Sequence, residues 1–80
     1  MTQLAVLIVE DEAILAAHLP SKVKLLGYRV IGPVSCGEEA LPLAREQTPD
    51  IALLDIRLDG HMDGIQTATR LKQLRDIPVI

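Results

Sequence analysis

Apolar and polar positions follow two alternating periods along the chain. Residues 4–9 form an unbroken apolar run that ends in acidic residues. Such a run is typical of a strand that is buried on both faces of a parallel sheet. Apolar side chains then recur at helical spacing over residues 12–26, and Gly27 is well placed to end that helix. The first third of the chain therefore predicts a buried strand followed by a helix.

The same alternation continues over the middle of the chain. Residues 28–34 are rich in β-branched side chains, which predicts a second strand. Ser35 and Glu38 have the S-x-x-E spacing of a capping box, in which each residue bonds the backbone N–H of the other. This spacing predicts a second helix that starts at Ser35 and continues to about Glu46.

The last third repeats the pattern once more. A third buried strand is predicted over residues 51–56, a third helix over residues 64–75, and the beginning of a fourth strand over residues 78–80. The positions of the third helix expected to face inward are Ile65, Ala68, Leu71 and Leu74. The order βαβαβαβ implies an α/β fold with a parallel sheet and right-handed crossovers, in one domain at most.

Two prolines conflict with this interpretation. Pro20 lies in the middle of the first predicted helix and Pro42 lies well inside the second. An interior proline removes a backbone hydrogen bond and clashes with the preceding turn, at a cost of about 3 kcal/mol or more. The apolar spacing continues across both prolines, so we expect each helix either to kink or to end early.

The C-terminal end of the chain predicts an incomplete domain. It falls within a strand, which would leave a bare sheet edge and an uncovered sheet face. Since a parallel sheet needs a layer of helices on both faces, either further residues or a second copy of the chain would supply the cover. A homodimer through the uncovered edge is one expected outcome.

Charge and composition exclude several classes of protein. The net charge is −3 and no cluster of Lys or Arg occurs, which argues against direct contact with nucleic acid. The apolar start is too short for a signal peptide or a membrane span. The lone Cys36 cannot form an internal disulfide and suggests a reducing compartment. We therefore expect a cytoplasmic protein that does not contact a membrane.

The positions of the acids indicate a site. Glu10 and Asp11 directly follow the first strand, and Asp55 lies at the end of the third. If those strands are neighbours, the three carboxylates converge outside the carboxyl ends of the sheet, where ligands of such folds bind. Their mutual repulsion favours a bound Mg²⁺ or Ca²⁺, and a carboxylate near Mg²⁺ can act as a phosphoryl acceptor. Taken singly, Asp11 could instead be a helix N-cap and Asp55 a turn residue.

At this point the sequence resembles a known family. The segments LAVLIVEDE, LGYRVIG, PDIALLDIRLDGHMDGI and IPVI are similar, in this order, to the receiver domains of two-component response regulators. The resemblance spans the whole chain and implies a flavodoxin-like sheet of strand order 2-1-3-4-5, incomplete after the start of the fourth strand. It implies a signalling protein rather than an enzyme.

The resemblance also implies roles for individual residues. Asp55 would be the phosphoacceptor, with a histidine kinase or a phosphotransfer protein as donor. Asp11 would bind Mg²⁺ directly, Glu10 would act through water, and the backbone carbonyl of Arg57 would complete the protein ligands. The Ser or Thr and the Lys that the family uses to sense the phosphoryl group would lie after Ile80.

Two alternatives remain open. A Mg²⁺-dependent phosphatase with an aspartate nucleophile would need a second Asp two residues after Asp55, but that position is Arg57. A binding scaffold that keeps the fold without phosphorylation, an inert fragment, or an intertwined dimer would need no acid triad, whereas the chain has one.

Overall fold

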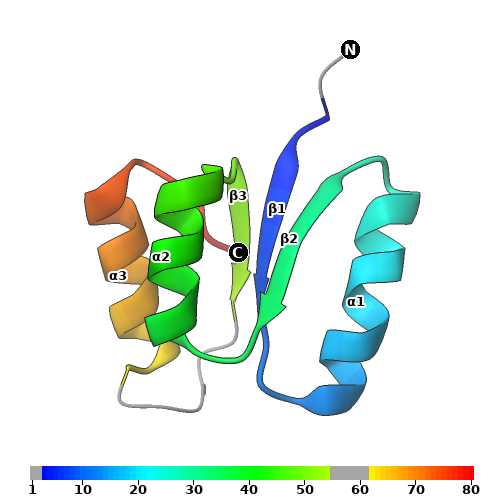
Figure 1. Cartoon of the computed structure of the whole chain (residues 1–80), viewed down its shortest axis with the longest axis horizontal. Coiled ribbons are helices and arrows are strands. Elements are labelled where there is room, and N and C mark those ends of the chain that lie inside the picture. Colours follow the sequence, from blue (N-terminus) through cyan, green and yellow to red (C-terminus); the bar gives the residue numbers. More distant parts are fainter. Residues whose placement is uncertain (1–2, 55–61) are drawn as a thin grey trace.

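A sheet covered by helices on both sides forms the fold (Figure 1). The computed structural model describes residues 3–54 and 62–80. Its elements are, in chain order, β1 (Ala5–Val9), α1 (Ala13–Leu25), β2 (Arg29–Val34), α2 (Gly37–Gln47), β3 (Ile51–Leu54) and α3 (Gly64–Leu74). Helix α1 lies on one side of the sheet, and α2 and α3 lie side by side on the other.

The sheet has the strand order β2-β1-β3, and both pairings are parallel. Val6 of β1 pairs with Val30 of β2 on one side and with Ile51 of β3 on the other. All five residues of β1 are buried, because strands flank it and helices cover both of its faces. The uninterrupted apolar run in the sequence is thus explained by the central position of this strand.

Residues 78–80 begin to pair with the outer side of β3. Ala52 forms a parallel bridge with Val79. The N–H of Ala52 donates to the Pro78 carbonyl, and the N–H of Ile80 donates to the Ala52 carbonyl, each at 2.9 Å. The predicted start of a fourth strand is confirmed, and the α/β fold has the 2-1-3 order of a flavodoxin-like sheet.

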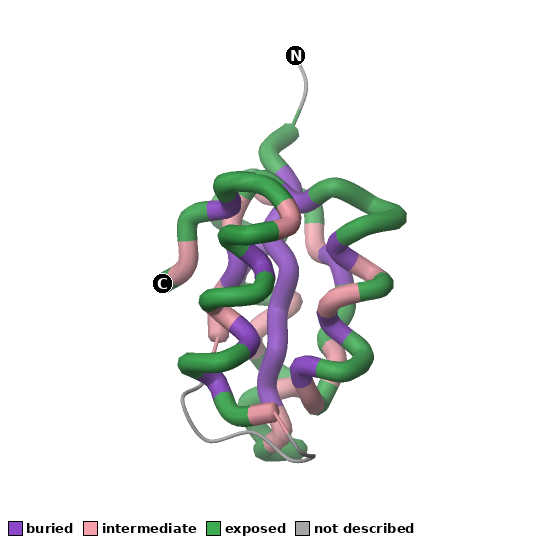
Figure 2. Tube along the Cα trace, turned by 90° about the vertical axis from the view of Figure 1, so that its left-hand side faces the viewer, coloured by how far each residue is buried: buried purple, intermediate pink, exposed green. Residues whose placement is uncertain are grey.

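Each face of the sheet has its own apolar cluster. Toward α2 and α3, the strand residues Leu7 and Ile31 pack with Ala44 and Leu71. Toward α1, the buried residues are Val6, Ile8 and Val23. Figure 2 shows that the buried stretches gather along the inner strands and the inward faces of the helices. Within the described residues, no helix is both long and apolar enough to span a membrane.

Both prolines lie inside continuous helices. Helix α1 continues through Pro20 to Leu25, and α2 continues through Pro42 to Gln47. The alternative that these helices end early is therefore wrong. In α2, Ala40 and Ala44 on either side of Pro42 are fully buried against the sheet. Their packing offsets the hydrogen bond that the proline cannot make, since tertiary burial outweighs local propensity.

The helix ends match the sequence prediction at one place and contradict it at another. Gly27 follows the end of α1 with φ +97°, a left-handed conformation that suits glycine, so the predicted stop is confirmed. The capping box predicted for Ser35 and Glu38 is wrong, because the N-cap of α2 is Cys36, which makes no side-chain cap bond. Ser35 therefore lies one residue before the cap, and its hydroxyl donates to the Glu39 carboxylate at 3.4 Å.

The capping box in fact lies at the start of α3. The Asp63 carboxylate accepts the N–H of Gln66 at 2.8 Å, and the N–H of Asp63 donates to the Gln66 side-chain oxygen at 3.0 Å. The backbone N–H groups of Asp63 and Gln66 are thus each bonded by the side chain of the other residue. The D-x-x-Q spacing of these two residues was visible in the sequence.

The inward face of α3 differs from the predicted one. Leu71 is fully buried as expected, and Ala68 and Leu74 are half-buried, but Ile65 is 65% exposed. Thr67 is fully buried instead. A threonine can occupy that position because its hydroxyl donates to the Asp63 carbonyl at 2.8 Å, which satisfies its polar group inside the helix. The expectation that Ile65 faces inward is therefore wrong.

Candidate functional site

The carboxyl ends of β1 and β3 meet at one edge of the sheet. Val9, the last residue of β1, pairs with Leu54, the last residue of β3. The N–H of Glu10 donates to the Val34 carbonyl at 2.9 Å, which also ties the exit of β1 to the end of β2. The sequence analysis required the first and third strands to be neighbours, and β1 and β3 are. This edge is where parallel sheets bind ligands.

Glu10 and Asp11 lie at that edge in different surroundings. Glu10 is only 8% exposed, and its carboxylate accepts the N–H of Glu12 at 3.1 Å. Asp11 is half-buried, and its side chain makes no hydrogen bond to a residue that the structure describes. One carboxylate is thus oriented by the protein, while the next is available to a ligand.

The interpretation of Asp11 as a simple helix cap is wrong. The N-cap of α1 is Glu12, whose carbonyl accepts the N–H of Ala16 at 2.9 Å and whose side chain makes no cap bond. Asp11 therefore lies one residue before the N-cap.

The predicted site residues Asp55 and Arg57 lie outside the described residues. Within residues 3–54 and 62–80, no three His, Cys, Asp or Glu side chains are grouped closely enough to hold a metal ion. The structure thus places the acid pair Glu10 and Asp11 beside the end of β3. The third predicted carboxylate, Asp55, is the residue that follows Leu54 in the sequence.

A contact that the sequence did not predict joins α2 to the start of α3. The N–H of Met62 donates to the carboxylate of Glu38 at 3.0 Å. Close by, Gly37 packs against the side chain of the buried Thr67. Glu38 and Met62 are 24 residues apart, so no local sequence signal could have indicated this contact. Glu38 therefore anchors the point where the chain enters α3, near the same edge of the sheet.

Comparison with known proteins identifies the fold. Residues 6–80 match the family described as Response regulator receiver domain. The chain belongs to the response-regulator receiver family. The predicted family is thereby confirmed, and receiver domains are signalling rather than catalytic modules.

Curated relatives of this receiver chain include transcriptional regulators. It is 48% identical over 77 residues to the Positive alginate biosynthesis regulatory protein of Pseudomonas aeruginosa, covering 94% of the chain and 31% of that protein. It is 33% identical over 75 residues to the Transcriptional regulatory protein PdtaR of Mycobacterium tuberculosis, covering 94% of the chain and 36% of that protein. The chain thus spans about a third of the length of these relatives.

Solved receiver domains have the same fold. The signal receiver domain of a modulated diguanylate cyclase from Desulfovibrio desulfuricans G20 superimposes with a TM-score of 0.91 at 47% identity, over 96% of this chain and 62% of that one. The receiver domain of the Erythrobacter litoralis response regulator PhyR gives 0.90 at 30% identity, over 100% and 62% of the two chains. The receiver fold of the described elements is therefore shown.

Proposed function

We propose that this receiver chain accepts a phosphoryl group on Asp55 and switches a downstream output in response. The observation that carries the proposal is the pairing of Val9 with Leu54, which brings the exit of β3 beside Glu10 and Asp11. Asp55 follows Leu54 in the sequence and is therefore our candidate for the third carboxylate. Family membership supports the same assignment, because receiver domains act as signalling modules.

The chemistry requires a positioned aspartate. A carboxylate oxygen of Asp55 forms the new bond to phosphorus, while the P–N bond of a phosphohistidine breaks and its electron pair stays on the imidazole nitrogen. The donor would be a histidine kinase or a phosphotransfer protein, and we expect this exchange in the cytoplasm. The aspartyl phosphate then biases a two-state equilibrium of the receiver surface.

The residues present at the edge fit a Mg²⁺ ion. Glu10, Asp11, Asp55 and the backbone carbonyl of Arg57 would hold it, and this all-oxygen donor set suits Mg²⁺. When bound, the ion neutralises charge on the transferring phosphoryl group. Glu10 is already oriented by the N–H of Glu12, whereas the Asp11 carboxylate has no bond to a described residue, which agrees with Asp11 as the direct ligand.

The acceptor assignment is tested by intact-mass spectrometry. The protein is incubated with acetyl phosphate, with and without Mg²⁺, alongside Asp55→Asn and the control Asp76→Asn, an exposed acid beyond α3. We expect one phosphoryl adduct on the wild type and on the Asp76 variant in Mg²⁺, and none on Asp55→Asn. An adduct that persists on Asp55→Asn would refute the assignment.

The metal assignment has a readout that does not depend on phosphorylation. Mg²⁺ binds only the folded state, so it should raise the melting temperature relative to a chelator. We expect Asp11→Ala to abolish this rise and Asp76→Ala to leave it intact. A Mg²⁺ effect of equal size in all three proteins would argue against the acid pair as ligands.

A further inference from the structure

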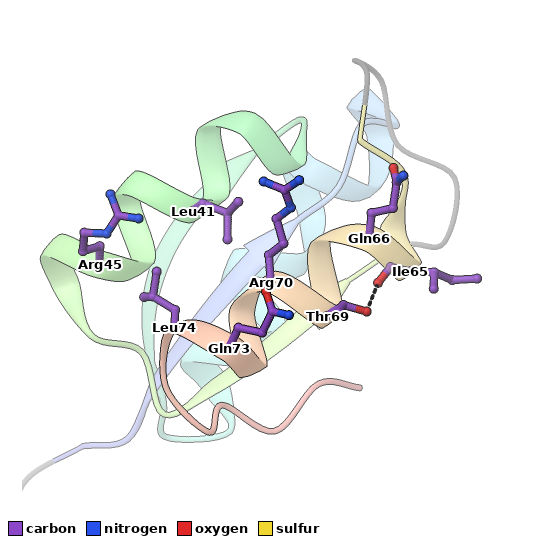
Figure 3. Close-up of a pocket in the computed structure, with 8 residues that line it drawn as sticks. All are labelled: Leu41, Arg45, Ile65, Gln66, Thr69, Arg70, Gln73 and Leu74. Atoms are coloured by element: carbon purple, nitrogen blue, oxygen red, sulfur yellow. Dashed lines mark hydrogen bonds between the residues drawn. The ribbon is translucent and has the colours of Figure 1, made fainter.

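A groove lies between the outer faces of α2 and α3 and has a volume of about 600 Å³. We propose that it binds a short acidic peptide segment of a partner protein. Figure 3 shows Leu41 and Arg45 on α2 facing Arg70 and Leu74 on α3. Glu10 and Asp11, the predicted site residues that the structure describes, do not line the groove, and the proposal does not rest on phosphorylation of Asp55.

The charged residues of the groove are both arginines. No acidic residue among those the structure describes lines it, although the chain as a whole has 11 acidic and 8 basic residues. Arg45 and Arg70 are exposed, and neither makes a hydrogen bond or ion pair with another described residue. Two guanidinium groups without carboxylate partners, on an acidic protein, form a local site of opposite charge.

Guanidinium groups select carboxylates by geometry as well as by charge. The planar fork of donors on arginine matches the two oxygens of a carboxylate in a bidentate pair. In Figure 3 the guanidinium groups of Arg45 and Arg70 lie on either side of Leu41. A ligand with two separated carboxylates would engage both groups at once.

An apolar surface lies between the two charges. Leu41 and Leu74 are half-buried, and Leu41 packs against the core cluster beneath α2. Ile65 at the start of α3 also lines the groove, but its side chain is 65% exposed and points away from the two leucines (Figure 3). An apolar side chain flanked by acids would therefore cover the leucines while its neighbours pair with the arginines.

The polar groups and the length of the groove suit a peptide backbone. The Thr69 hydroxyl already donates to the Ile65 carbonyl at 3.0 Å, so it is committed to its own helix. The Gln73 amide has no partner among the described residues and can bond a peptide group of the ligand. Along α3, the distance from Ile65 to Leu74 is about 14 Å, which corresponds to about four residues of extended chain.

A nucleic acid fits this surface less well than a peptide. Bases bind to proteins largely by stacking on aromatic side chains, but the only aromatic residue of the chain is Tyr28, which lies outside the groove. Leu41 and Leu74 would also have no apolar group to pack against in a phosphate backbone.

Fluorescence anisotropy with labelled peptides tests the proposal. The probe is an eight-residue peptide with a central leucine between pairs of aspartates, compared with the same peptide carrying lysines. We expect binding of the acidic probe only, and weaker binding as salt screens the charges. The variant Arg45→Gln/Arg70→Gln should bind about five- to tenfold more weakly, since exposed charge pairs contribute modestly.

The control is Arg29→Gln/Arg75→Gln, which removes the same charge from exposed arginines outside the groove. Circular dichroism verifies that both double variants are folded. An equal loss of affinity in the two double variants would mean that only the net charge matters, and it would overturn the proposal. It would also be overturned if the acidic probe failed to bind at low salt, or if a single-stranded oligonucleotide bound the groove in its place.

Discussion

The substitution Gly37→Ala tests how tightly α2 is packed against α3. Gly37 is the first residue of α2, and it lies against Thr67 of α3, which is fully buried. A Cβ atom added at position 37 would fall on the Thr67 hydroxyl and lie 3.2 Å from the Thr67 Cβ and 3.0 Å from the Met62 sulfur. The hydroxyl cannot move aside freely, because it donates to the Asp63 carbonyl at 2.8 Å.

The size of the effect follows from these contacts. Inserting a methyl group into a filled space costs about 1–3 kcal/mol, and losing the Thr67 hydrogen bond would add about 1 kcal/mol. Alanine has a higher helix propensity than glycine, which stabilises the folded state by at most about 1 kcal/mol. We therefore expect a loss of about 1–3 kcal/mol in the free energy of unfolding. In a domain of this size, each kcal/mol lowers the melting temperature by about 4–8 °C.

A double-mutant cycle separates this clash from other effects of the substitution. Urea and thermal denaturation, followed by circular dichroism, are measured for Gly37→Ala, Thr67→Ala and the double variant. Thr67→Ala removes the hydroxyl that the new Cβ would meet, so the double variant should be more stable than the two single effects predict, by about 1 kcal/mol. Strictly additive effects, or a Gly37→Ala protein as stable as the wild type, would refute the reasoning.

Two further predictions concern backbone hydrogen bonds. The N–H of the buried Ala5 donates to the Asp50 carboxylate at 2.7 Å, so Asp50→Ala should lower the free energy of unfolding by about 1–3 kcal/mol in urea denaturation. The control Asp76→Ala should change it little, and equal losses would contradict this account. Pro42 lies on the exposed side of α2, so Pro42→Ala should raise the melting temperature, because it restores a helical N–H and removes the ring clash. If the melting temperature did not rise, the stabilisation that proline gives by lowering the entropy of the unfolded chain would equal the cost of its missing hydrogen bond and ring clash.

The arrangement of elements could be predicted because it depends on periodicity. The apolar run of β1 and the helical spacing after it are properties of the sequence that no distant contact needs to decide. The same holds for Glu10 and Asp11, whose place at the end of a buried strand assigns them to the ligand-binding edge. Val9 pairs with Leu54 as that interpretation requires.

The start of α2 could not be predicted because a distant contact occupies the side chain involved. Ser35 and Glu38 have the spacing of a capping box, yet the Glu38 carboxylate accepts the N–H of Met62 instead. The α2 helix then begins two residues after Ser35, at Gly37. Spacing alone cannot distinguish this pair from Asp63 and Gln66, which do form the capping box.

The prolines and Thr67 illustrate the same limit for packing. Local rules predict a kink or an early end at Pro42, but the burial of Ala40 and Ala44 keeps α2 continuous. Those rules also direct the large Ile65 inward and the polar Thr67 outward. The observed rotation of α3 is the reverse, because Gly37 leaves a space that the smaller side chain fills.

Two contacts next to residues 55–61 bear on the proposed phosphoacceptor, because phosphoryl transfer to a carboxylate depends mainly on positioning. Leu54 is held through its pairing with Val9 and through its N–H, which donates to the Ile80 carbonyl at 3.1 Å. Met62 is held by Glu38. The two described residues that border residues 55–61, Leu54 and Met62, are thus held by the sheet and by α2, which is the kind of positioning that such a transfer needs.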